Sequence, residues 1–143
     1  MTIYMNNPEL GFRVQRRGCW LLAILYIMEK RGVLEVTPQL VNSLHEPLRA
    51  SDRHVISRKT IVIRPQEFLD YLAPGRFKWL RKVEEILPTD EVVMVHTDTG
   101  GGKHSVVQKP GDRIEYNPMG RVSSLSATAP ILGYRIIRDL KVG

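Results

Sequence analysis

Apolar residues in the first half of the chain are spaced as in helices. Residues 19–28 form an uninterrupted apolar run, so we expect a helix over residues 18–31 that is buried on every side. Thr37 followed by Pro38 is typical of a helix N-terminus, because threonine can cap the first turn and proline fits its first position. Pro65 is expected to open a third helix in the same way.

The second half of the chain is richer in β-forming residues and turn signals. Five strands are expected, at residues 78–83, 91–96, 105–108, 113–116 and 134–137. The turn signal at residues 109–112 joins two of these strands in a hairpin. Residues 1–17 are expected to be an irregular N-terminal arm, and residues 47–59 and 97–103 to be loops. We therefore predict a single α+β domain over residues 1–143, with a central buried helix packed on a C-terminal antiparallel sheet.

Length, cysteine content and charge exclude several classes of protein. A chain of 143 residues can bury a core without cross-links, and its one cysteine cannot form an intramolecular disulfide. The longest apolar run is too short to cross a bilayer, so we expect a cytoplasmic protein without a membrane partner. The net charge of +6 suits an acidic partner, but the basic residues are scattered and match no nucleic-acid-binding motif.

The single cysteine, Cys19, lies where a polar segment meets the long apolar helix. The positive end of the helix dipole and the neighbouring Arg16 and Arg17 should favour its thiolate, which is the nucleophilic form. A lone cysteine is nevertheless more often a small buried hydrophobic residue. A catalytic role therefore depends on whether the second half of the chain supplies a base.

The strongest candidate for that base among the four histidines is His104, which follows a glycine-rich loop and begins a hairpin strand. If the turn is centred between Pro110 and Gly111, continuing the register outward places His104 directly opposite Asn117. Directly opposed residues have Cβ atoms roughly 4.5–5.5 Å apart, close enough for an imidazole to bond to an amide. The hairpin thus predicts a base with an orienting partner.

Three short motifs together resemble the papain-like cysteine peptidases. They are the helix start Gly18-Cys19-Trp20, the strand start His104-Ser105-Val106-Val107 and the turn Tyr116-Asn117-Pro118-Met119-Gly120. The nearest resemblance is to the branch that processes double-glycine bacteriocin leaders. The chain is also similar to a group of small phage- and plasmid-borne proteins that share a Gly-Cys helix and a Tyr-Asp/Asn-Pro turn.

The resemblance implies a papain-like fold with Cys19 as nucleophile, His104 as general base and Asn117 as orienting residue. The leader-processing branch has Asp at the third position, whereas papain has an amide there. The family also places an oxyanion-stabilising Gln about six residues before its Cys. Arg13 holds that position in this chain, and the nearest glutamine is Gln15.

These observations favour a small thiol hydrolase that cleaves a peptide or amide bond through a Cys-His-Asn site. One alternative is a catalytically degenerate papain-like module that binds a protein or peptide, and a weaker one is a basic nucleic-acid-binding protein. The expected partner is a peptide or protein substrate. No ligand spacing typical of zinc is present in the sequence, so we expect neither a metal nor a cofactor.

Overall fold

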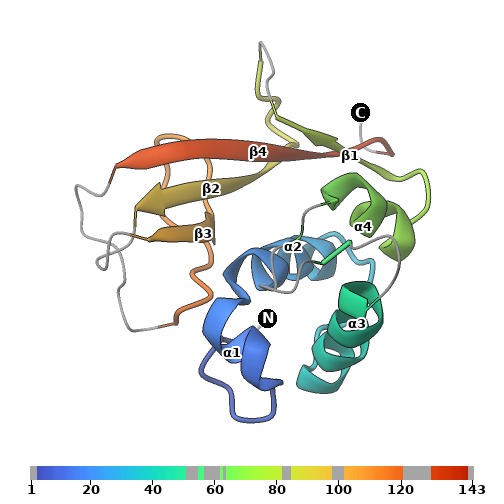
Figure 1. Ribbon diagram of the computed structural model, residues 1–143. Helices are drawn as coiled ribbons and strands as arrows, with labels where there is room; N and C mark the ends of the chain where they lie inside the picture. The colour runs from blue at the N-terminus through green and yellow to red at the C-terminus, as the bar shows by residue number, and fades with distance from the viewer. Residues whose placement is uncertain are drawn as a thin grey trace.

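Helices come first along the chain and strands follow, and the helices pack on one face of the sheet in the computed structural model (Figure 1). The structure describes residues 3–50, 55–56, 62, 64–81, 85–97, 102–120 and 130–141. Its helices are α1 (Phe12–Arg17), α2 (Cys19–Lys30), α3 (Pro38–Ala50) and α4 (Pro65–Leu72). Its strands are β1 (Phe77–Leu80), β2 (Glu91–Thr97), β3 (Lys103–Val107) and β4 (Ile131–Asp139). The predicted α+β class is confirmed.

The helix starts that the sequence predicted are confirmed by their local bonds. Helix α2 begins at Cys19, where the Leu22 N–H donates to the Gly18 carbonyl. Helix α3 is capped by Thr37, whose hydroxyl oxygen accepts the Leu40 N–H at 3.1 Å. Helix α4 begins at Pro65, the position where proline costs no backbone bond.

Two segments expected to be irregular contain helix. Helix α1 lies within residues 1–17, and its Val14 is fully buried. The apolar residues of this segment show no clear helical spacing, so its helix is stabilised by packing against the core. Helix α3 continues to Ala50 through Pro47, where a loop was expected, because Leu44 and Leu48 extend its buried face across the proline. Residues 51–54 and 57–59 of that expected loop lie outside the described residues.

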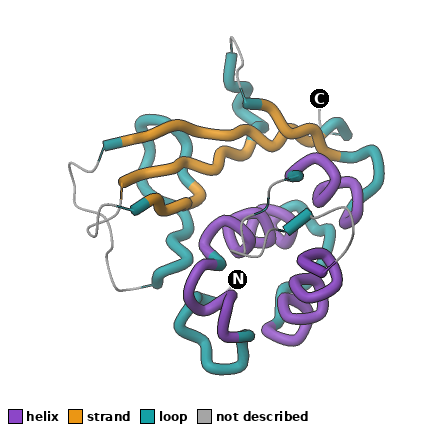
Figure 2. The backbone as a smooth tube through the Cα atoms, viewed as in Figure 1, coloured by secondary structure: helices purple, strands orange, loops and turns teal. Residues whose placement is uncertain are grey.

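The described strands form one antiparallel sheet in the order β1-β4-β2-β3, which leaves β3 at one edge (Figure 2). The strand expected over residues 113–116 is not formed. Only an isolated bridge joins Val107 to Tyr116, whereas the predicted register places Val107 opposite Ile114. The predicted register is therefore wrong by two residues, because the loop between Val107 and Tyr116 is not the tight hairpin turn that was expected.

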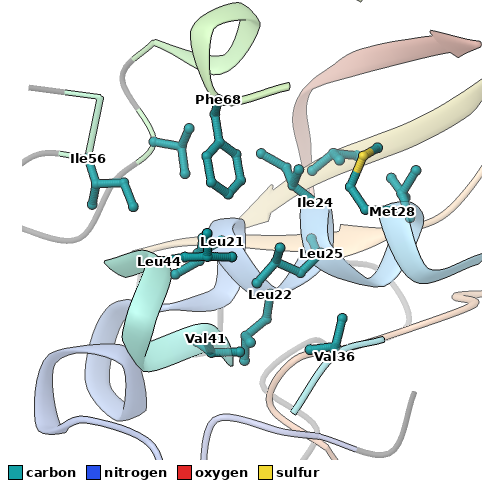
Figure 3. Close-up of a cluster of buried hydrophobic side chains, with 14 of the residues drawn as sticks. Leu21, Leu22, Ile24, Leu25, Met28, Val36, Val41, Leu44, Ile56 and Phe68 are labelled. Atoms are coloured by element: carbon teal, nitrogen blue, oxygen red, sulfur yellow. The ribbon is translucent and has the colours of Figure 1, made fainter. Parts of the chain in front are cut away.

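Residues on the two faces of the sheet enter different hydrophobic clusters. Val93 and Val107 belong to the main core with α2, α3 and α4, and Figure 3 shows Phe68 of α4 pointing between Ile56 and Ile24. A smaller cluster occupies the opposite face and consists of Val92, Met94, Val106 and Ile136. Alternate residues of each strand thus face the helices, which assigns a direction to every side chain of β3.

Ion pairs with buried carboxylates join residues at the end of α2 to β2, and the residue before β1 to β4. The Glu91 carboxylate is almost fully buried and binds Arg31 at 2.8 Å and Lys30 at 3.1 Å. Asp139, buried at the end of β4, binds Arg76 at 3.0 Å. Among the described residues, no helix is both long and apolar enough to span a membrane.

Candidate active site

Cys19 lies at a sharp junction between two helices. It is the first residue of α2, and only Gly18 separates it from the end of α1. A Cβ atom on Gly18 would lie 2.5 Å from the Val14 carbonyl oxygen, so no larger side chain fits there without movement. The glycine therefore permits the close approach of backbone that sets Cys19 at a helix N-terminus.

The surroundings of the Cys19 thiol correct one expectation from the sequence. Burial raises the pKa of the thiol, because a thiolate would lose its hydration. Hydrogen bonds from the Ser105 and Trp20 backbones and from the Ser105 hydroxyl oppose this effect without overcoming it. The pKa of the thiol is therefore raised above its ordinary value, whereas the helix start and the nearby arginines led us to expect a lowered one.

The His104 ring is held in one orientation by Asn117. His104 is 3% exposed, and its Nε2 atom lies 2.6 Å from Asn117 Oδ1. The same Oδ1 atom accepts the backbone N–H of Met119 at 3.0 Å, which identifies it as the amide oxygen. Nε2 must then carry the proton, and Nδ1 is the basic nitrogen of the neutral ring.

Hydrogen bonds and aromatic stacking hold the turn that carries Asn117 in place. Gly120 adopts a φ of 73° and donates its N–H to the Asn117 carbonyl at 2.8 Å. The N-terminal segment lies against the turn, where the Met5 N–H donates to the Pro118 carbonyl at 2.8 Å. Next to the turn, Tyr116 is stacked between Tyr4 of the N-terminal segment and Tyr26 of α2, so both segments pack against it.

Strand β3 belongs to both halves of the candidate site, because it packs on α2, which begins at Cys19, and carries His104. Val107 directs its N–H and carbonyl toward Tyr116, away from β2, so the N–H of Ser105 points toward the same edge. Hydrogen bonding from Ser105 is among the influences that lower the pKa of the Cys19 thiol. By strand alternation the His104 side chain starts on the opposite face of β3 from Ser105, and its ring bonds to Asn117, in the turn that follows Tyr116.

The expected oxyanion residue is engaged elsewhere. The Gln15 side chain lies on α1 and donates from Nε2 to the Leu10 carbonyl oxygen at 2.6 Å. Arg13, six residues before Cys19, is exposed. The backbone N–H of Cys19 lies in the first turn of α2, where N–H groups have no partner within the helix.

Two further residues of this region were missed by sequence reasoning. Ser105 is buried on β3 and is among the groups that lower the pKa of Cys19, and its only signal in the sequence is that it follows His104 in a strand. His96 is the cross-strand partner of His104, and its Nε2 atom lies 2.9 Å from Gln108 Oε1. Among the described residues, the buried Nδ1 of His96 finds no hydrogen-bond partner.

Within the described part of the chain, no group of three or more His, Cys, Asp or Glu residues could hold a metal ion. Comparisons with known proteins add no assignment: no family model matches the chain, and neither a curated protein nor a solved structure shows significant similarity to it.

Proposed function

We propose that the protein is a papain-like thiol hydrolase that cleaves a peptide or amide bond. The observation that carries this proposal is the tautomer of His104. Its Nε2–H bond to Asn117 leaves Nδ1 as the proton acceptor, and His104 lies on β3, the strand that packs on α2, whose first residue is Cys19. A nucleophile, a base and an orienting group are the parts that such a reaction requires.

In the proposed reaction, the Cys19 sulfur attacks the substrate carbonyl while its proton passes to Nδ1 of His104. The carbonyl oxygen becomes an oxyanion and accepts the backbone N–H of Cys19. Collapse of this intermediate expels the amine, which takes the proton back from His104. Water then cleaves the thioester with His104 again acting as base, which releases the acid and restores the thiol.

Burial of the thiol explains why a base is necessary. Because the pKa of Cys19 is raised, little thiolate exists near neutral pH without help. A base held within reach removes the proton as the carbon–sulfur bond forms, and such general base catalysis typically contributes about 10²–10⁴-fold. Asn117 supports this step by fixing the ring and by stabilising the imidazolium.

A second candidate function is a papain-like binding module with a degenerate site. Two observations favour it: burial raises the pKa of the thiol, and the Gln15 amide is committed to the Leu10 carbonyl. Such a module would hold a protein or peptide in the same place without cleaving it.

The two candidates are separated by incubating the protein with a complex peptide mixture and sequencing the new termini. Wild type is expected to generate new termini at a common sequence context, and Cys19→Ala to generate none. Cys19→Ser serves as the matched control, because it keeps the size of the side chain and replaces only the sulfur. New termini produced equally by all three proteins would reject a role for the thiol, whereas their absence in all three would favour the binding module.

A further inference from the structure

Helix α1 presents a basic and aromatic surface beside the start of α2. We call it the α1 surface, and it consists of the exposed residues Phe12, Arg13, Arg16 and Arg17. The Phe12 ring is 67% exposed, and the Arg16 guanidinium lies over it, with Cζ 4.5 Å from the ring centroid. Arg17 ends α1, and only Gly18 separates it from Cys19.

The positive charge of the α1 surface has no acidic partner within the part of the chain that the structure describes. None of its arginines makes an ion pair there, and α1 itself contains no acidic residue. Glu9, just before α1, accepts the Gln39 side-chain amide at 3.5 Å instead. Arginines beside the sheet differ in this respect, because each has a carboxylate: Arg31 binds Glu91, Arg76 binds Asp139 and Arg138 binds Asp90.

The crowding of these arginines is unfavourable for α1 itself. Arg13 is three residues from Arg16 and four from Arg17, spacings at which like charges on a helix repel each other. The helix dipole favours the two arginines in the last turn but disfavours Arg13 in the first turn. Because a six-residue helix is marginal on its own, an anionic ligand that neutralises these charges would relieve a repulsion within α1.

The size and composition of the α1 surface favour a short acidic peptide segment over a nucleic acid. Six helical residues span about 9 Å, which matches about three residues of an extended peptide. Even a single DNA-binding module buries about 600–1,000 Å² of protein surface. Each guanidinium can bind a carboxylate through two hydrogen bonds, and the exposed Phe12 ring offers an apolar contact between them.

We propose that the α1 surface binds an acidic segment of the peptide or protein on which the thiol site acts. A segment held on α1 lies beside Cys19, since α1 leads directly into the helix that begins with this residue. The inference rests on the proposed function for what happens to the bound peptide, but not for binding itself.

Peptide binding tests the α1 surface without requiring cleavage. The probes are a short fluorescein-labelled peptide of alternating Glu and Leu, its copy with Gln in place of Glu, and a labelled oligothymidylate. Fluorescence anisotropy follows their binding to Cys19→Ala, so that cleavage cannot remove a peptide. We expect the Glu peptide to bind about tenfold more tightly than the Gln peptide, as three exposed charge pairs would provide. Added salt should reduce this preference by screening the charges.

Two matched variants separate the α1 surface from the net charge of the protein. The test variant carries Arg13→Gln, Arg16→Gln and Arg17→Gln. The control loses the same charge near β1 and the end of β4, away from α1 (Figure 1), through Lys78→Gln, Arg81→Gln and Lys141→Gln. The test variant should bind the Glu peptide about tenfold more weakly, and the control should stay within about twofold. If the test variant fails to fold, the comparison of the Glu and Gln peptides on unaltered arginines still decides the matter.

Absent or equal binding of the Glu and Gln peptides would overturn the proposal, and so would an equal loss of affinity in the two variants. Tighter binding of oligothymidylate than of the Glu peptide, lost in the test variant, would overturn it in favour of a nucleic-acid-binding surface. Failure of the proposed hydrolysis is a separate result. If wild type generates no new peptide termini while the Glu peptide binds as expected, the α1 surface stands as the binding surface of a module that does not cleave.

Discussion

Replacing Asn117 with alanine should destabilise the protein and release the His104 ring. The Asn117 Oδ1 atom accepts two hydrogen bonds, from His104 Nε2 at 2.6 Å and from the Met119 N–H at 3.0 Å. Loss of the first leaves a donor unpaired on a buried ring, which costs about 1–3 kcal/mol. Loss of the second, in a half-buried turn, costs about 1 kcal/mol. The free energy of unfolding should therefore fall by about 2–4 kcal/mol.

Asn117→Asp is the matched control, because a carboxylate keeps an oxygen acceptor for both donors. Urea unfolding of wild type and the two variants measures the effect, with the midpoint falling in Asn117→Ala at an unchanged slope. The aspartate variant should stay within about 1 kcal/mol of wild type. If the alanine variant unfolds at the same urea concentration as wild type, the two bonds to Oδ1 do not hold this turn, and the assigned tautomer of His104 loses its basis.

Two further predictions concern the backbone near the thiol and the acid stability of the sheet. Gly18→Ala should lower the free energy of unfolding by about 1–3 kcal/mol, because its Cβ would lie 2.5 Å from the Val14 carbonyl oxygen. Gly133→Ala, whose Cβ would meet nothing closer than 3.6 Å, should change it by no more than about 0.5 kcal/mol, and thermal unfolding of the pair checks both values. Hydrogen bonds from Arg76 hold the pKa of Asp139 below its usual value. The ion pair therefore stabilises the fold fully above the unfolded-state pKa of about 3.9. This stabilisation is lost as the pH falls through the lower pKa of the folded state. The stability gap between wild type and Asp139→Asn should therefore narrow below about pH 4, and a gap that stays constant to pH 2 would contradict the assignment.

The helix-forming signals in this sequence are local, and the structure follows them. Thr37 caps α3 through its own hydroxyl, and the apolar run after Gly18 forms the buried α2. The segments that were mispredicted depend on distant partners. Helix α1 is ordered by burial of Val14, and α3 passes through Pro47 because its apolar face remains in the core on both sides.

The candidate site shows the same division between local and tertiary information. The contact between His104 and Asn117 is present, although the ladder register that suggested it is shifted by two residues. The side chains compensate, because Asn117 lies in a turn fixed by Met119 and Gly120 rather than in a paired strand. The raised pKa of Cys19 could not be read from the sequence, since burial depends on how α2 packs against β3.

The pH dependence of Cys19 alkylation in wild type and His104→Ala shows whether His104 acts as the base for Cys19. Iodoacetamide reports the thiolate without requiring a known substrate. If the imidazole assists, the wild-type rate should rise through the pH range in which histidine loses its proton, near pH 6.5, and this limb should disappear in His104→Ala. If both proteins show the same single rise, with the thiol indifferent to residue 104, Cys19 and His104 do not form a catalytic pair.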